Sequence, residues 1–201
     1  NHGFEGRVLP INPNRETIFG AKCYPHIESA PGPVDHAFIM LPTGGVIEAV
    51  RQCGAAGVGC VTILAGGFAD SGAAGRRRQD KLVAVARDGG VRLVGPNSIG
   101  VINTLAGATL SVNAVFEMPG LAAGGLSVIS HSGSLLGALV SRGQARNLRF
   151  SKLVSVGNEA DLGVGEVGDM LVDDPETEAI LLFLETIRSP NAIACMARRA
   201  H

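Results

Sequence analysis

The residues best suited to chemistry lie in one short run, Ser130–Ser134, which reads Ser-His-Ser-Gly-Ser. A short apolar run typical of a strand, Leu126–Ile129, precedes it, and an apolar helical pattern follows at once. A turn between a strand and a helix points unpaired backbone N–H groups and the positive end of the helix dipole at whatever lies above it, which suits an anion, usually phosphate. Ser132, Gly133 and Ser134 add hydroxyl donors and leave room for the anion. Taken alone, the run is explained equally well by Ser132 as a simple helix cap.

Two later apolar runs also end in polar residues. We call Ser132–Ser134 the serine turn. Lys152–Val156 is followed by Gly157 and Asn158, which we assign to the same phosphate site as the serine turn. Ile180–Leu184 is followed by Glu185, whose carboxylate would stand at the rim of a buried strand. A carboxylate there can orient an imidazole or accept its proton, although a plain strand-terminal acid explains Glu185 at least as well.

Four loops in the first half of the chain share a different chemistry, rich in proline, glycine and asparagine. They are Asn12–Asn14, Pro42–Gly45, Ala65–Phe68 and Gly95–Ser98. Each follows an apolar run that is typical of a strand, and ligands of open parallel sheets bind beyond the carboxyl ends of the strands. Asn12, Thr43 and Asn97 offer directional hydrogen bonds. Ordinary turn formation explains any single loop, but four such loops in register predict one continuous binding crevice.

The composition favours an α/β protein and excludes several classes of partner. The 201 residues are 46% hydrophobic with 28 glycines, which suits aliphatic parallel strands and tight strand-to-helix turns. With a net charge of −1 and one short basic cluster, Arg76–Arg78, nucleic acid is not expected as the main partner. The four cysteines have no C-x-x-C spacing, so we expect neither a disulfide framework nor a zinc site, and a reducing cytoplasm fits best. No apolar run reaches the roughly 18 residues that span a membrane, so we expect no membrane partner.

Strands and helices must alternate to position these residues. The predicted strands are Arg7–Ile11, His36–Leu41, Gly59–Leu64, Val91–Val94, Leu126–Ile129, Lys152–Val156 and Ala179–Leu184. Helical patterns cover Val46–Cys53, Leu82–Ala86, the stretch from Ser134 onward, and Asn191–His201. This alternation predicts parallel sheets with right-handed crossovers.

The glycine-rich segment Asn103–Gly125 interrupts the alternation and indicates a linker between two α/β units. We therefore place a domain boundary near residue 120, which gives units over 1–120 and 121–201. A complete nucleotide-type domain opens with a strand and a glycine-rich turn, whereas Asn1–Gly6 is typical of a helix end. Both units are therefore expected to be incomplete, as parts of a longer polypeptide.

Six motifs in collinear order resemble the nucleoside-diphosphate-forming acyl-CoA synthetases, relatives of the succinyl-CoA synthetase α subunit. The motifs are Leu9–Pro13, Gly32–Asp35, Gly95–Gly100, Ser130–Ser134, Val156–Asp161 and Asp173–Thr177. The resemblance extends over essentially the whole chain. The resemblance implies an incomplete Rossmann-like CoA-binding domain followed by an incomplete flavodoxin-like ligase domain with a parallel sheet.

In that family ATP phosphorylates a histidine, the phosphoryl group passes to a carboxylic acid, and the CoA thiol displaces it to give the thioester. The resemblance implies that the CoA crevice is lined by Asn12, Pro13, Pro42, Gly67, Phe68, Pro96 and Asn97. It also implies that the turn Ser132–Ser134 holds the phosphate of the phosphohistidine and that Glu185 steadies the histidine ring. ATP or ADP with Mg²⁺ would bind to an ATP-grasp domain or subunit outside this chain, in an oligomer that acts on a small carboxylic acid or its acyl-CoA.

Two residues depart from the family pattern. Ser98 stands where relatives often carry Cys, and because both side chains are small we expect little change in function. His131 stands where relatives usually carry Gln or another polar residue. The family's phosphohistidine lies further along, in a glycine- and alanine-rich loop. A structural role or an auxiliary phosphate contact is therefore expected for His131.

Three other functions fit the sequence less well. A non-catalytic CoA or acyl-CoA sensor of a protein acetyltransferase has no need to hold a phosphohistidine, so the serine turn and Glu185 favour the ligase. An NAD-linked dehydrogenase is disfavoured because no G-x-G-x-x-G lies between a predicted strand and a predicted helix. A serine hydrolase is disfavoured because Ser132 lacks the G-x-S-x-G frame.

Overall fold

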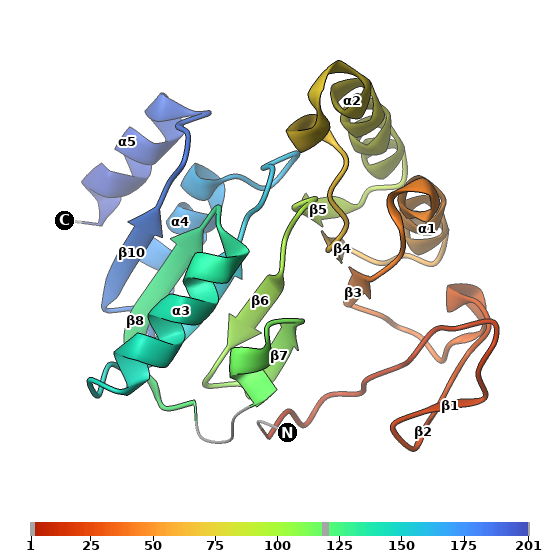
Figure 1. Cartoon of the computed structure of the whole chain (residues 1–201), viewed down its shortest axis with the longest axis horizontal. Helices are drawn as coiled ribbons and strands as arrows, with labels where there is room; N and C mark the ends of the chain where they lie inside the picture. Colours follow the sequence, from red (N-terminus) through yellow and green to blue (C-terminus); the bar gives the residue numbers. More distant parts are fainter. Residues whose placement is uncertain (1–2, 118–120, 201) are drawn as a thin grey trace.

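The computed structural model describes residues 3–117 and 121–200, which form two α/β units side by side (Figure 1). The first unit has a parallel sheet of β3 (His36–Ile39), β4 (Cys60–Ile63) and β5 (Arg92–Val94), in the order β3-β4-β5. The helices α1 (Thr43–Ala55) and α2 (Gly72–Asp88) make the crossovers between these strands. Their apolar stripes bury Val46, Val50 and Leu82 in one core with the sheet residues Ile63 and Leu93.

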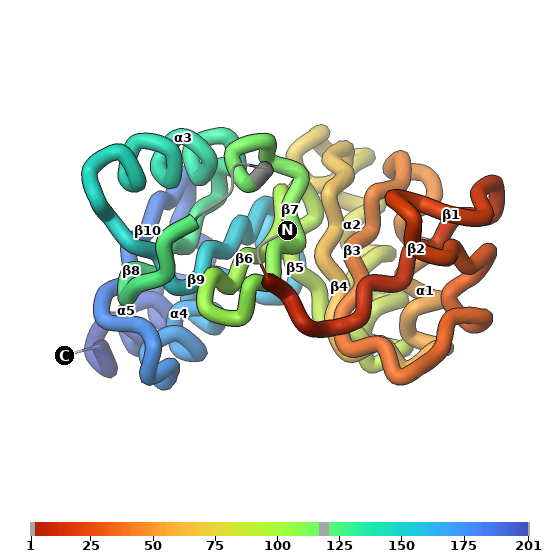
Figure 2. Tube along the Cα trace, turned by 90° about the horizontal axis from the view of Figure 1, so that it is seen from below, coloured from red at the N-terminus to blue at the C-terminus, as the bar shows by residue number. Residues whose placement is uncertain are grey.

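The second unit has a five-stranded mixed sheet in the order β10-β8-β9-β6-β7. Its strands are β6 (Gly100–Asn103), β7 (Ala108–Ser111), β8 (Ala123–Ser130), β9 (Phe150–Ser155) and β10 (Ala179–Phe183). β8 is parallel to β9 and β10, whereas β6 is antiparallel to β7 and β9. Helix α3 (Gly133–Gln144) covers one face, and α4 (Val164–Val172) and α5 (Pro190–Arg199) cover the other (Figure 2). Neighbouring strand residues alternate accordingly, since Val128 packs in the core under α3 and Ile129 in the core under α4.

The predicted strand Arg7–Ile11 is wrong. Within the described residues this run makes one bridge, from Ile11 to Tyr24, and Pro10 has no N–H to donate to a neighbouring strand. Val8 is 70% exposed, so the run is not buried as a sheet strand would be. Residues 3–6 are not helical, contrary to the helix end expected over 1–6, of which residues 1–2 lie outside the described part. The chain forms instead a short hairpin, β1 (Thr17–Ile18) and β2 (Ala21–Lys22), apart from the main sheets (Figure 1).

The segment Asn103–Gly125 is not the plain linker that its glycines suggested. It holds β7 and a short 3-10 helix, Ala114–Glu117, and the β6–β7 hairpin extends the second sheet because β6 pairs with β9. Gly100 allows this approach: its φ is +124°, and a Cβ there would lie 1.8 Å from the Leu110 carbonyl oxygen. The predicted boundary near residue 120 falls at residues 118–120, outside the described part, and stays a prediction.

Helix α4 has no counterpart among the predicted helices. Gly163, Gly165 and Gly168 give the segment a G-x-G-x-x-G spacing, but the last two glycines lie inside the helix. A Cβ on Gly165 would lie 2.5 Å from the Cβ of Ala192, and one on Gly168 would lie 2.8 Å from Cγ of Met196. The glycines therefore allow α4 and α5 to pack closely, and the spacing is structural here, not a dinucleotide-binding turn.

A seam of polar contacts joins the two units between the loop after β5 and the loop after β9. Backbone hydrogen bonds across it run from Asn158 to Pro96, from Ala160 to Gly95 and from Leu162 to Leu93. Ser98 Oγ donates to the Ser155 carbonyl oxygen at 2.6 Å. Arg92 forms ion pairs with Asp161 at 2.8 Å and with Glu166 at 2.9 Å. The strand-end loops of the two sheets are therefore fixed relative to each other.

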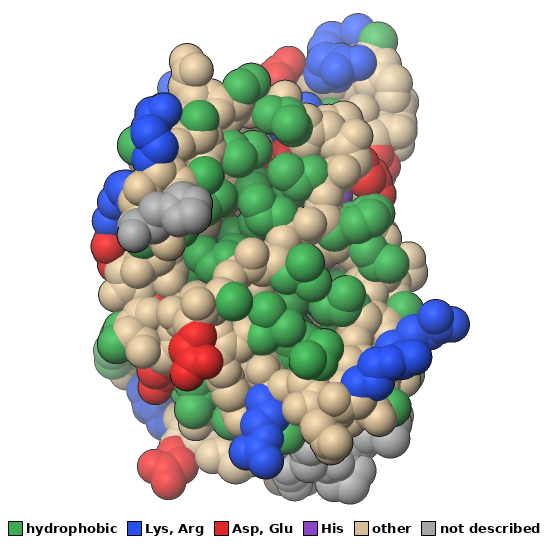
Figure 3. Space-filling view, turned by 90° about the vertical axis from the view of Figure 1, so that its left-hand side faces the viewer, with side chains coloured by type: hydrophobic (Ala, Val, Ile, Leu, Met, Phe, Trp, Pro, Cys, Tyr) green, Lys and Arg blue, Asp and Glu red, His purple; other side chains and the backbone are tan. Residues whose placement is uncertain are grey.

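The molecular surface is apolar along the side where β10 forms the edge of the described sheet. Leu181 and Phe183 of this strand are 39% and 40% exposed. Figure 3 shows hydrophobic side chains gathered on the face viewed from that side. Among residues 3–117 and 121–200, no helix has both the length and the apolar character needed to cross a bilayer.

Candidate functional site

Three of the four predicted crevice loops meet at the carboxyl end of the first sheet. Pro42 is the N-cap of α1, and its neighbour Thr43 donates from Oγ1 to the Gly66 carbonyl oxygen at 2.8 Å. The Asn97 N–H donates to the Ala65 carbonyl oxygen at 2.9 Å. The loops after β3, β4 and β5 therefore form one connected group. We call the segments Pro42–Gly45, Ala65–Phe68 and Gly95–Ser98 the crevice loops.

The backbone of the crevice loops is shaped by residues with positive φ. Gly67 has a φ of +84°, and a Cβ there would lie 3.1 Å from Thr43 Oγ1. Asn97 has a φ of +59°, in the left-handed region that asparagine tolerates better than most residues. Pro96 lies between Gly95, which has a φ of +98°, and Asn97. The crevice loops therefore depend on backbone conformation more than on charged side chains.

The Asp70 carboxylate, which the sequence analysis did not identify, accepts hydrogen bonds from the backbone of the loop after β4. Its Oδ2 accepts from the Gly67 N–H at 2.8 Å, and its Oδ1 accepts from the Phe68 N–H at 3.0 Å. Partial burial alone would raise the pKa of Asp70, but these bonds and a third from Asn158 outweigh burial and lower the pKa. The Phe68 side chain is fully buried in the core, so only the backbone of Phe68 is left to face the crevice.

The fourth predicted loop, Asn12–Asn14, is anchored elsewhere. The Asn12 N–H donates to the Tyr24 carbonyl oxygen at 2.9 Å, and Cys23 Sγ lies 3.7 Å from the Asn12 carbonyl oxygen. Asn12 Oδ1 accepts from the Asn14 N–H at 2.9 Å in a local turn. These contacts tie the loop to residues 23–24, and the crevice roles of Asn12 and Pro13 stay predictions.

Gly157 and Asn158 lie in the seam, against the crevice loops. Gly157 has a φ of +53°, and a Cβ there would lie 2.3 Å from the Pro96 carbonyl oxygen. Asn158 is buried, and its Nδ2 donates to Asp70 Oδ1 at 2.7 Å and to Gln79 Oε1 at 3.3 Å. The Asn158 side chain is thus engaged with the first unit, and the phosphate-binding role of both residues stays a prediction.

The serine turn joins β8 to α3, as the sequence predicted. Ser132 is the N-cap of α3, and its Oγ accepts from the Leu135 N–H at 3.3 Å. Ser134 is exposed, with its Oγ 3.2 Å from Ser132 Oγ. Gly133 packs against Ile99, because a Cβ there would lie 2.4 Å from Ile99 Cγ2. The capping role of Ser132 is therefore present, and the exposed Ser134 hydroxyl and the start of α3 offer donors to an anion.

Three strand ends bring a histidine and two glutamates together beside this turn. His131, at the end of β8, lies with Nε2 2.6 Å from Oε1 of Glu159, in the loop after β9. His131 Nδ1 accepts from the backbone N–H of Glu185, after β10, at 2.9 Å. The His131 and Glu159 side chains are 5% and 7% exposed, and Arg188 Nε lies 3.7 Å from Glu159 Oε1. We call these four residues the His131 cluster.

Glu185 lies at the rim where the sequence placed it, with its side chain exposed. Its backbone is one hydrogen bond from His131, the residue that precedes the serine turn at Ser132. Its proposed contact to an imidazole stays a prediction. Glu159 was missed, although it belongs to the motif Val156–Asp161, because only the tertiary structure brings that loop beside His131.

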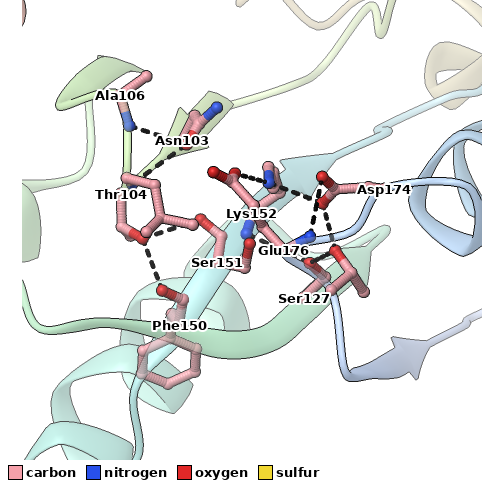
Figure 4. A network of polar contacts seen from close by, with 11 residues as sticks. Asn103, Thr104, Ala106, Ser127, Phe150, Ser151, Lys152, Asp174 and Glu176 are labelled. Carbon is pink, nitrogen blue, oxygen red and sulfur yellow. Dashed lines mark hydrogen bonds and ion pairs between the residues drawn. The ribbon is translucent and has the colours of Figure 1, made fainter.

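The motif Asp173–Thr177 has a structural role before the start of β10, where Asp174 and Glu176 lie beside Lys152 (Figure 4). Lys152 of β9 pairs with Asp174 at 2.6 Å and also with Glu176. Burial alone would lower the pKa of Lys152, but the two carboxylates raise it. Thr177 Oγ1 donates to Asp174 and lies 2.9 Å from the Ser127 hydroxyl of β8. The motif therefore fixes the loop that leads into β10.

Comparison with known proteins gives the family. A family model described as CoA binding domain matches residues 2–104, and one described as succinyl-CoA ligase like flavodoxin domain matches residues 123–201. The chain is 35% identical over 98% of its length to a trans-feruloyl-CoA synthase of an unknown prokaryotic organism, of which it covers 28%. It is 35% identical over 96% of its length to the acetate–CoA ligase [ADP-forming] II subunit alpha of Pyrococcus furiosus, of which it covers 41%.

A solved structure gives the same result. The dinucleotide forming acetyl-coenzyme A synthetase 1 of Ca. Korarchaeum cryptofilum, in complex with phosphate and ADP, matches with a TM-score of 0.91 at 33% identity. That match covers 99% of this chain and 42% of the solved chain, so the chain spans less than half the length of these relatives. The fold predicted from the six motifs is confirmed. The chain belongs to the nucleoside-diphosphate-forming acyl-CoA synthetases, as a CoA-binding domain followed by a succinyl-CoA-ligase-like flavodoxin domain.

Proposed function

We propose that this chain binds CoA and holds the phosphoryl group in a ligase that converts an acid, CoA and ATP to acyl-CoA, ADP and phosphate. The observation that carries the proposal is the meeting of the serine turn and Glu185 at one edge of the second sheet. The seam joins that edge to the crevice loops. The CoA binding domain match supports CoA as the ligand of the crevice, and the ADP-forming relatives support the reaction class.

The serine turn suits a phosphate group carried on a histidine. The start of α3 presents backbone N–H groups and the positive end of its dipole, which favours a nearby anion by about 0.3–1 kcal/mol. The exposed Ser134 hydroxyl adds a donor. His131 is not the phosphorylated histidine in this geometry, because both of its ring nitrogens are engaged and its side chain is buried.

Glu185 suits the histidine ring itself. An exposed carboxylate at the rim can accept one imidazole N–H, which leaves the lone pair of the other ring nitrogen free to attack the γ-phosphorus of ATP. ADP departs, and the phosphoryl group then moves to the carboxylate of the acid. The CoA thiolate attacks the resulting acyl phosphate at its carbonyl carbon and releases inorganic phosphate.

The crevice loops suit the CoA end of the reaction. We propose that Pro42, Gly67, Pro96 and Asn97, with the backbone of Phe68, contact CoA, and that the loop of Asn12 and Pro13 completes the site. The nucleotide would bind to an ATP-grasp domain or subunit within an oligomer. A reducing cytoplasm fits the thiols of Cys23, Cys53, Cys60 and Cys195, which are all free. The relatives named above are a trans-feruloyl-CoA synthase and an acetate–CoA ligase, which supports a carboxylic acid as the substrate class.

Calorimetric titration of the full-length parent protein with CoA tests the crevice, with NAD as the control ligand. Saturable binding of CoA but not of NAD is the expected result. Absence of CoA binding to a folded protein would overturn the crevice assignment. ATP-dependent phosphorylation then separates a ligase from a non-catalytic acyl-CoA sensor, since a sensor would bind CoA without forming phosphohistidine.

Serine substitutions test the turn. The double change Ser132→Ala with Ser134→Ala should lower both phosphohistidine accumulation and turnover, because it removes two hydroxyls beside the start of α3. Ser141→Ala, an exposed serine near the end of the same helix, is the matched control and should behave as the unmodified protein. If the double variant accumulates phosphohistidine and turns over at the rates of the unmodified protein, the serine turn has no part in the mechanism.

A further inference from the structure

The two ring nitrogens of His131 carry opposite roles. Nδ1 receives the backbone N–H of Glu185 at 2.9 Å, so Nδ1 bears no proton. Nε2 lies 2.6 Å from Glu159 Oε1, an ionisable oxygen to which an Nε2–H donates. The imidazole is therefore the neutral tautomer with its proton on Nε2. A ring that is hydrogen-bonded at both nitrogens does not rotate freely, so it holds the backbone N–H of Glu185 in one position.

The Glu159 carboxylate is itself held in place by contacts at both of its oxygens. Its Oε2 accepts from the N–H of Val164, the first residue of α4, at 2.8 Å. This places the carboxylate at the positive end of a helix dipole. Arg188 lies 3.7 Å away on the other oxygen. Glu159 also adopts a φ of +49°, a left-handed conformation that costs energy in a non-glycine residue and persists only where contacts such as these offset it.

The chain of contacts ends at the loop that carries Glu185. Two hydrogen bonds tie that loop to the residue before the serine turn: His131 Nδ1 accepts from Glu185, and the His131 N–H donates to the Phe183 carbonyl oxygen at 3.1 Å. Without an acceptor at Nδ1, the Glu185 N–H would lose its hydrogen-bond partner on the His131 ring. The same peptide group leads into the Cα of Glu185, so holding it in place holds the point from which the Glu185 side chain extends.

We propose that His131 is a positioning residue for Glu185, held in the Nε2–H form by Glu159. The part of this proposal that concerns turnover rests on the ligase function proposed above. The hydrogen bond between His131 and Glu185 is independent of that function, because it is observed in the structure. Of the two roles expected from the sequence, this one is structural; an auxiliary phosphate contact is disfavoured because the buried ring has no nitrogen left to offer a phosphate.

Hydrogen exchange in the full-length protein tests the link without reference to activity. The Glu185 amide should be protected from exchange in the unmodified protein and should lose that protection in His131→Ala. His131→Asn should restore it, because the Asn Oδ1 stands near the position of Nδ1 and can accept the same N–H. Equal protection in all three proteins would overturn the proposal, as would the loss of protection in His131→Asn when that variant is folded.

A double-mutant cycle tests the consequence for turnover. Displacing Glu185 should slow phosphorylation by ATP about tenfold or more in His131→Ala, the order of effect produced by a misplaced reacting group. CoA affinity should not change, because the crevice loops lie in the first unit. In a Glu185→Gln background the same His131→Ala change should add little, since both changes act on one carboxylate. Additive losses would show that His131 acts on the reaction by another route and would overturn positioning.

The two experiments separate the two proposals. If the full-length protein binds CoA but is never phosphorylated, the ligase function fails, while hydrogen exchange still decides whether His131 holds Glu185. If phosphorylation occurs and exchange at Glu185 is insensitive to His131, the ligase function stands and the positioning role fails.

Discussion

The crevice loops and the His131 cluster occupy the same place on two different sheets, beyond the carboxyl ends of the strands, yet they are built differently. The crevice loops hold their shape with backbone hydrogen bonds, positive φ angles and one carboxylate, Asp70. The His131 cluster holds its shape with buried ionisable side chains that contact each other. A backbone-built surface suits close contact with a large ligand, whereas fixed ionisable groups suit the positioning of a small charged one.

The largest expected effect comes from breaking the seam that keeps the two regions together. Gly157→Ala would place a Cβ 2.3 Å from the Pro96 carbonyl oxygen at a φ of +53°. Left-handed strain and overpacking together should destabilise the protein by about 3 kcal/mol. Chemical denaturation measures the loss, with Gly90→Ala as the matched control.

Gly90 makes that control informative because only one of the two costs applies there. It has a φ of +68° and no heavy atom within 4 Å of an added Cβ. Gly90→Ala should therefore cost about 1 kcal/mol, from backbone strain alone. Similar losses in both variants would contradict the close approach at the seam.

The second-largest effect is expected from Asn158, which contacts the segment after β4 and supports the crevice loops. Asn158→Ala removes the amide that donates to Asp70 and Gln79, and should cost about 1–3 kcal/mol because Asn158 is buried. It should also weaken CoA binding in calorimetry while leaving the His131 cluster intact. Asn14→Ala, an exposed asparagine, is the control and should stay within about 0.5 kcal/mol of the unmodified protein. An unaltered stability in Asn158→Ala would mean that the loops after β4 and β9 do not depend on each other.

The two regions also differ in how much of them the sequence predicts. Each crevice loop follows a short apolar run, and the strands after which they lie, β3, β4 and β5, form close to their predicted ranges. These loops meet because parallel strands end at one edge, a rule that needs no knowledge of side-chain contacts. Asp70 was not identified because it follows no predicted strand directly, and its bond from Asn158 forms only when the loops after β4 and β9 meet in the folded protein.

The His131 cluster could be predicted only in part. Ser132 and Glu185 follow predicted strands, so their positions at the sheet edge were accessible. The contact of His131 with Glu159 depends on the loop after β9 folding back over the end of β8, and no periodicity encodes that. The β6–β7 hairpin was missed for a related reason. Its glycines indicate a linker until the pairing of β6 with β9 is known.

The smallest effect is a dependence of stability on pH that belongs to the crevice loops. Hydrogen bonds hold the pKa of Asp70 below its ordinary value of 3.8, so the folded protein binds a proton at this site less readily than the unfolded chain does. The stabilisation is therefore fully present above pH 3.8 and is lost as the pH falls through the folded pKa. Asp70→Asn should reduce the change in unfolding free energy with pH below pH 3.8.

Unfolding by urea across that pH range measures the slope. Asp88→Asn, which changes an exposed carboxylate at the end of α2, is the matched control and should keep the slope of the unmodified protein. The loss must be modest because Asp70 is exposed and water screens its interactions. Since His131 and Glu159 lie outside the crevice loops, their replacement should leave this part of the profile in place. A slope that vanished in Glu159→Gln instead of in Asp70→Asn would place the acid sensitivity in the second unit and reverse the contrast between the two regions.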